Sequence, residues 1–167
     1  MAFSDADLPL WAYLAFSLVV LTITLVRYAD PYVAITLFVC WLILWFDLLT
    51  NFPYGKIILP FVIMFVSATS YWFFYKWELS TYYNSVKTII TSMALVSFYL
   101  AGNYYVVREG NAMLNSLSES VQIVYAPIFY FFSGIIPALY IFFGLRNHDR
   151  RLLIIGILVA AFSIFTY

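Results

Sequence analysis

Residues 32–50 read YVAITLFVCWLILWFDLLT, and Asp47 is the only charged residue among them. An α-helix rises about 1.5 Å per residue, so a helix of this length nearly matches the hydrocarbon core of a bilayer, which is roughly 30 Å thick. The rest of the chain has a similar composition. Hydrophobic residues make up 65% of its 167 residues and charged residues 10%, whereas about 25% of a soluble domain is charged. The sequence therefore predicts that lipid is the main solvent of this protein.

Six stretches are apolar enough to be predicted as membrane-spanning helices. They are residues 8–26, 32–50, 57–75, 88–107, 122–145 and 152–167, and almost all charges fall between them. The predicted fold is an all-α, polytopic transmembrane helix bundle that forms a single domain over residues 1–167. The sixth stretch is short, because its sixteen residues rise only about 24 Å. Either Tyr167 anchors its outer end, or the chain is a piece of a longer protein cut within this helix.

The basic residues are distributed unevenly between the connections of the predicted helices. The odd-numbered connections hold Arg27, Lys76, Lys87, Arg146, Arg150 and Arg151, and the even-numbered ones hold Lys56 and Arg108. Connections rich in Lys and Arg stay on the cytoplasmic side of a membrane. This distribution therefore predicts that the odd connections are cytoplasmic and that the N-terminus is outside, as is the C-terminus if there are six spans. We expect the cytoplasmic membrane of a bacterium rather than an organelle membrane.

Local signals predict several helix ends. Asp30 precedes Pro31, which places a capping acceptor before a proline in the first turn of a helix. Residues 116–119, SLSE, fit a capping box at the start of the fifth predicted helix. Between residues 108 and 121, apolar side chains recur every four positions at Met113, Leu117 and Val121. This spacing is compatible with a short interfacial helix on the outer side or with an ordinary loop.

Asp47 is the one acid well inside a predicted span. An ionised carboxylate in hydrocarbon is costly, and the C-terminal end of a helix carries a negative partial charge. Asp47 should therefore be paired, protonated or in contact with water. One interpretation is an ion or proton site that also includes Asn103 and Gln122. The other is a structural pair near the outer interface with Lys56 or Arg108, or a contact with Gln122.

Other polar and small residues within the spans have a structural and a functional interpretation. A buried Asn103 can hydrogen-bond across helices, or it can bind a ligand. Pro127 and Pro137 should kink the fifth predicted helix, which shapes packing or opens a cavity. Small residues four apart permit close helix packing or offer a surface to a partner. Such pairs are Ser97 with Ala101, Gly134 with Ala138, and Gly156 with Ala160.

The segment from Arg146 to Arg151 is strongly basic. Its arginines, Arg146, Arg150 and Arg151, are candidate contacts for anionic lipid headgroups, and His148 lies among them. The alternative interpretation is that this segment only anchors the cytoplasmic side of the bundle.

The supply of catalytic and metal-binding side chains is small. The chain has one His and one Cys, and no nucleotide-binding, nucleophile or zinc motif is present. With a formal net charge of zero, nothing favours nucleic acid as a partner. We therefore expect no metal, no cofactor and more likely no enzyme activity. The first hypothesis is a non-catalytic membrane subunit or membrane domain that packs against other membrane chains or against itself. The alternative is a small transporter or channel with its ion or proton site at Asp47.

Overall fold

The computed structural model describes residues 9–77, 80–115, 122–123 and 125–166, and every regular element in these ranges is helical. The elements in chain order are α1 (Leu10–Tyr28), α2 (Pro31–Thr50), α3 (Gly55–Lys76), the 3₁₀ turn η1 (Thr81–Tyr83), α4 (Asn84–Gly102), α5 (Tyr104–Leu114), α6 (Ala126–Arg146) and α7 (Arg150–Phe165). The all-α prediction is therefore confirmed for the described part of the chain.

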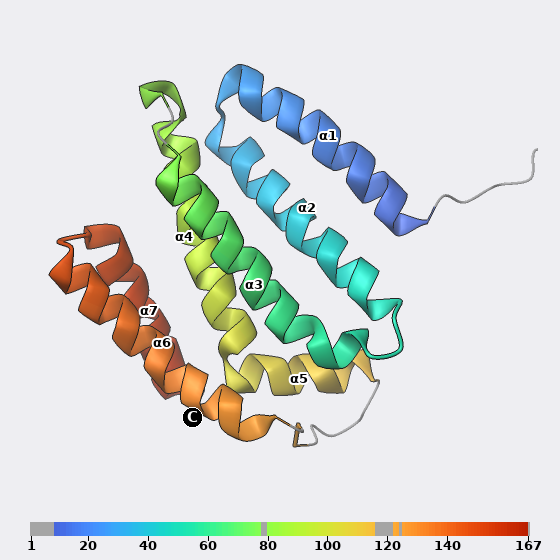
Figure 1. Cartoon of the computed structure of the whole chain (residues 1–167), viewed down its shortest axis with the longest axis vertical. Coiled ribbons are helices and arrows are strands. Elements are labelled where there is room, and N and C mark those ends of the chain that lie inside the picture. Colours follow the sequence, from blue (N-terminus) through green and yellow to red (C-terminus); the bar gives the residue numbers. More distant parts are fainter. Residues whose placement is uncertain (1–8, 78–79, 116–121, 124, 167) are drawn as a thin grey trace, which may run out of the picture.

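Five of these helical segments are long and apolar enough to cross a membrane: α1, α2, α3, α4 together with η1, and α6. This supports a multi-pass membrane protein. The remaining predicted span corresponds to α7, which has 16 residues and packs along α6 as the second arm of a hairpin (Figure 1). The boundaries predicted for the second and third spans agree with α2 and α3 to within two residues.

The fourth predicted span, 88–107, is not one helix. Helix α4 ends at Gly102, and α5 begins at Tyr104 in a new direction, across the ends of α3 and α4 (Figure 1). The side chain of Asn103 causes the break, because its oxygen accepts a hydrogen bond from the amide of Val106 and so caps α5. Of the two alternatives for this connection, a helix rather than an ordinary loop is therefore present, and it begins before Arg108. Residues 117 and 121 of the predicted apolar face, and the predicted capping box at 116–119, lie outside the described residues.

Side-chain capping explains other helix ends. The carboxylate of Asp30 accepts hydrogen bonds from the amides of Tyr32, at 2.7 Å, and Val33, at 3.2 Å, as the Asp-Pro pair predicted. Asp149 caps α7 in the same way through the amides of Arg151 and Leu152. These contacts satisfy amide groups that would otherwise lack a partner within the helix.

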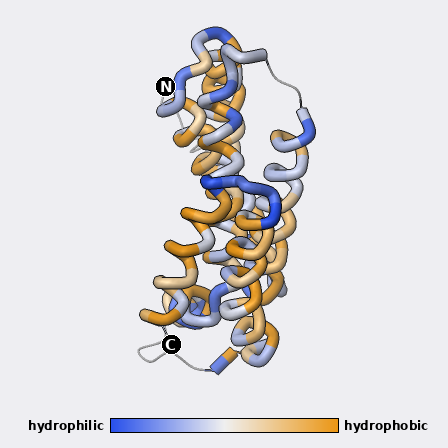
Figure 2. The backbone as a smooth tube through the Cα atoms, turned by 90° about the vertical axis from the view of Figure 1, so that its left-hand side faces the viewer, coloured by the Kyte–Doolittle hydropathy of each residue, from blue (hydrophilic) through white to orange (hydrophobic). Residues whose placement is uncertain are grey.

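The bundle consists of three helical hairpins, α1–α2, α3–α4 and α6–α7, and α4 is its central helix. Helix α4 packs against α2, α3, α6 and α7, whereas α1 packs mainly against α2. One apolar core joins α1, α2 and α4 around Phe38 and Ile90, and a second joins α3, α4, α6 and α7 around Tyr99 and Ile136. Hydrophobic residues dominate along the helices, and hydrophilic residues gather at the turns (Figure 2).

Hydrogen bonds join the three odd-numbered connections at one end of the bundle. The hydroxyl of Tyr83 donates to the carbonyl of Val26 at 2.6 Å, so η1 lies against the end of α1. The guanidinium of Arg151 donates to the hydroxyl of Thr88 at 2.8 Å, so the start of α7 lies beside the start of α4. The six basic residues of these connections are thus gathered at one end, which we call the basic end.

Candidate functional site

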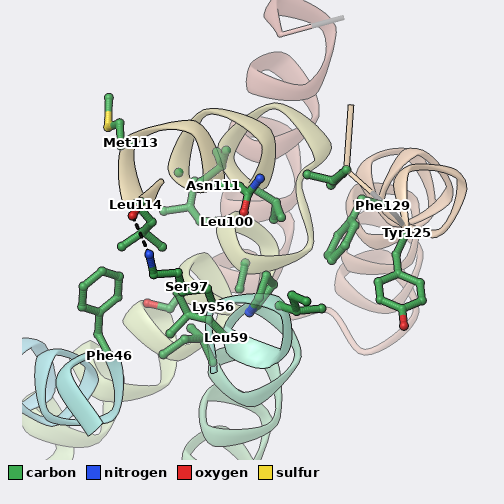
Figure 3. A pocket seen from close by; sticks show the side chains of 18 of the residues that line it. Phe46, Lys56, Leu59, Ser97, Leu100, Asn111, Met113, Leu114, Tyr125 and Phe129 are labelled. Carbon is green, nitrogen blue, oxygen red and sulfur yellow. Dashed lines mark hydrogen bonds between the residues drawn. The ribbon is translucent and has the colours of Figure 1, made fainter. Parts of the chain in front are cut away.

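A large cavity lies at the end of the bundle opposite the basic end. Its volume is about 810 Å³, and it is enclosed by α2, α3, α4, α5 and the beginning of α6 (Figure 3). Most of its wall is carbon, contributed by residues such as Leu42, Phe46, Leu59, Ile63, Leu100, Val107, Leu114 and Phe129. Polar side chains in its lining include Lys56, Ser97, Asn111 and Gln122. Volumes of roughly 300–1,000 Å³ with mostly apolar walls and a few polar groups are typical of small-molecule sites.

Asn103 fixes α5 as one wall of this cavity. Its side chain is 1% exposed, and its amide donates a 2.8 Å hydrogen bond to the hydroxyl of Tyr99 while its oxygen caps α5. Ser133 of α6 also holds the junction, since its hydroxyl accepts a 2.9 Å hydrogen bond from the amide of Tyr104. Both polar groups of the Asn103 side chain thus have protein partners, but these lie at the junction of α4 and α5 rather than across two packed helices.

Lys56 holds the other end of α5. Its ammonium donates a 2.8 Å hydrogen bond to the carbonyl of Leu114 and a 3.3 Å hydrogen bond to the side-chain oxygen of Asn115. Leu114 is the last residue of α5, where carbonyl groups lack partners within the helix and the helix dipole is negative. Lys56 was predicted only as a basic residue of an even-numbered connection and as a candidate partner for Asp47. Only one signal indicated that a helix would end beside Lys56. This signal was the amphipathic pattern of the residues before position 114.

Asp47 lies half-buried near the end of α2 and is not part of the cavity lining. Its backbone carbonyl accepts hydrogen bonds from the side chains of Thr50 and Asn51. No ion pair or hydrogen bond of its carboxylate is found among the described residues. The predicted pair with Lys56 or Arg108 is wrong for these residues, because Lys56 binds the end of α5 and Arg108 pairs with Glu109 at 3.4 Å.

The three residues of the predicted ion or proton site lie in different surroundings. Gln122 is exposed and lines the large cavity. Asn103 lines a small polar pocket of about 170 Å³ between α5 and α6, together with Arg108 and Ser133. Asp47 lines none of the cavities described here. The structure therefore does not bring these three side chains into one cavity.

The three predicted headgroup arginines also differ. Arg151 lines a polar pocket of about 190 Å³ at the basic end, with Lys87, Tyr75 and Asp149. Its Nε lies 3.8 Å from the carboxylate of Asp149, so part of its charge is balanced. Arg146 and Arg150 are exposed and do not line this pocket.

The prolines of the fifth predicted span have separate roles. Helix α6 begins at Ala126, so Pro127 occupies its first turn, where a missing amide is harmless. The predicted kink at Pro127 is therefore wrong, because the span starts later than its hydropathy suggested. Pro137 lies inside α6 and is buried. Because proline has no backbone N–H, α6 lacks one hydrogen-bond donor at this position.

The small-residue pairs occupy three different environments. Gly156 packs against α6, where a side chain would meet the backbone of Ile141 at 2.9 Å. Ser97 and Ala101 line the cavity. Gly134 and Ala138 face outward on α6, and a methyl group at Gly134 would meet no heavy atom within 4 Å.

In the described ranges, no group of three or more His, Cys, Asp or Glu side chains comes together to hold a metal ion. In comparisons with known proteins, no family model, curated protein or solved structure matches this chain.

Proposed function

We propose that this integral membrane protein is a non-catalytic subunit or membrane domain of a larger assembly, and that it associates through the outward face of α6. The observation that carries the proposal is the exposed pair Gly134 and Ala138, which no other described helix covers. Small residues four apart let two membrane helices approach closely, and the resulting van der Waals contact drives their association. A second copy of the chain is the simplest occupant, since the same face on two copies would be self-complementary.

The extent of apolar surface in the bundle supports the part of the proposal that concerns a larger assembly. In the apolar 18-residue stretches of α4 and α6, 33% of the residues are buried within the chain. In the corresponding stretches, the buried share is 6% in α1 and 11% in α2. Either lipid or another chain must cover the remaining surface of the first hairpin. If the chain belongs to a larger assembly, a neighbouring chain would cover part of this surface.

Gly134→Leu tests the association. The structure offers open space at this position, so the larger side chain should leave the monomer folded and block the close approach of a second helix. We expect the wild-type protein in a mild detergent to be larger than a monomer or to co-purify with a second membrane chain, and the variant to be monomeric. Ala161→Leu is the matched control, because Ala161 is an exposed small residue on a different helix, α7. A wild-type protein that purifies alone as a monomer would rule out the proposal.

We further propose six spans, with the N-terminus outside and the basic end in the cytoplasm of a bacterium. The gathering of the odd connections at one end supports this orientation, because the positive-inside rule then acts on all of them together. The test uses single cysteines at Ser80 and Asn51, both exposed, in a Cys40→Ala background. A membrane-impermeant maleimide added to intact cells should label residue 51 and not residue 80. The opposite pattern would reverse the orientation.

A second candidate is a small transporter or channel with an ion or proton site at Asp47. It is supported by the carboxylate of Asp47, which has no partner among the described residues although it lies within a span. The position of Asp47 outside the cavity lining favours the first proposal.

A further inference from the structure

The cavity beneath α5 requires a hydrophobic occupant. A space of about 810 Å³ could hold many water molecules by volume, but an apolar wall gives them few hydrogen-bond partners. Leaving the space empty would forfeit the dispersion contacts of all the side chains that line it. Because the wall is built from membrane-spanning helices, the nearest supply of hydrocarbon is the acyl chains of the surrounding lipid.

The edge of the cavity is open to such a chain. Phe46 on α2, Ile57 on α3 and Tyr125 before α6 all line the cavity and are each more than 40% exposed. An acyl chain can therefore enter sideways from the leaflet at this end of the bundle, without passing through the core. Helix α5 lies across the ends of α3 and α4 (Figure 1), and its residues Asn111, Met113 and Leu114 line the cavity (Figure 3).

Lys56 gives this cavity a charge preference. Of the lining residues that the structure describes, Lys56 alone is basic. Among the described residues, both acceptors of its ammonium are neutral, and no carboxylate lies within ion-pair distance. An ammonium has three donors, so one N–H is left for a further acceptor. A positive charge next to an apolar cavity is stabilised by an anion, and hydrogen bonds to an ionised group are about twice as strong as neutral ones.

We infer that this cavity is a binding site for an anionic phospholipid, with one acyl chain beneath α5 and the phosphate bound by Lys56. The polar side chains of Asn111 and Gln122 line the same cavity and are available to the glycerol and headgroup oxygens. The inference does not depend on the association proposed for α6, because the site is formed within a single copy of the chain.

The test is native mass spectrometry of the protein released from micelles that contain either phosphatidylglycerol or phosphatidylcholine. The two lipids carry the same acyl chains and differ in the net charge of the headgroup. Wild-type protein should retain phosphatidylglycerol preferentially. Lys56→Gln should reduce that preference about tenfold, as expected for the loss of one charge-assisted hydrogen bond, and Lys56→Arg should restore most of it.

Two further variants distinguish binding of the lipid headgroup from binding of the acyl chain. Gly110→Phe should reduce the binding of both lipids, because Gly110 lines the cavity and a side chain there would enter open space. Lys76→Gln removes the same charge at the basic end, where Lys76 lies over the ring of Trp72, and should leave the preference unchanged. Equal retention of both lipids by the wild-type protein would overturn the inference. So would a preference that Lys56→Gln leaves intact, because Lys56 would then serve only to hold the end of α5.

Discussion

The hydroxyl of Tyr83 donates a 2.6 Å hydrogen bond to the carbonyl of Val26, 57 residues earlier in the chain. Val26 belongs to the last turn of α1, where carbonyl groups have no partner within the helix. Tyr82 makes a similar contact with the carbonyl of Arg27 at 3.2 Å. These two tyrosines attach the peripheral first helix to the central hairpin at the basic end.

Tyr83→Phe should therefore destabilise the protein. The change removes one hydrogen bond and keeps the ring, and the expected loss is about 1 kcal/mol in the free energy of unfolding. Thermal unfolding in detergent measures it. Tyr28→Phe is the control, because Tyr28 is exposed and contacts Arg27 through its ring face, which the variant retains. Equal stability of the two variants would show that the Tyr83 contact contributes nothing.

Asn103→Ala should have a larger effect. It removes the cap of α5 and leaves the hydroxyl of Tyr99, a residue 1% exposed, without this partner. Losing a cap costs about 1 kcal/mol, and an unsatisfied buried polar group costs about 1–3 kcal/mol more. Denaturant unfolding of the variant, compared with Asn147→Ala at an exposed site, tests this expectation. A loss no greater than that of Asn147→Ala would contradict the role assigned to Asn103.

Two glycines of the last hairpin should respond to alanine in opposite directions. At Gly156 the new methyl group would lie 2.9 Å from the backbone nitrogen of Ile141 and 3.1 Å from Cβ of Tyr140, so Gly156→Ala should separate α6 from α7. Overpacking of this kind costs about 1–3 kcal/mol. Gly134→Ala meets no such contact and should stabilise the monomer by about 0.5–1 kcal/mol, because alanine favours a helix over glycine. Thermal unfolding of both variants decides the comparison, and similar shifts would show that the hairpin is not closely packed at Gly156.

Asp47→Asn separates the two candidate functions. An unpaired carboxylate near the C-terminal end of a helix faces a negative dipole, so its neutralisation should leave stability unchanged or raise it by up to about 1 kcal/mol. Proton flux into liposomes, followed with a pH-sensitive dye, should be the same for the variant and for Glu109→Gln. A wild-type flux that disappears in Asp47→Asn at unchanged stability would favour the transport candidate instead.

Hydropathy alone determined the membrane class, the all-helical content and most helix ends. Asp30 predicted the start of α2, and the alternation of antiparallel spans predicted that the odd-numbered connections share an end of the bundle. These are properties of single segments or of their order along the chain, and the transfer of apolar residues into lipid dominates them. The same reasoning failed at Asn103, where a local side-chain cap ended a helix within an apolar stretch.

Only the tertiary structure decided which faces of the helices meet. Lipid-facing and buried surfaces are both apolar here, so the sequence of a span does not mark its inner face as it does in a soluble protein. Lys56 meets the end of α5 across 58 residues, and the cavity beside it is formed by four helices and the start of a fifth. Such a space depends on the relative placement of distant segments, which no periodicity within one segment specifies.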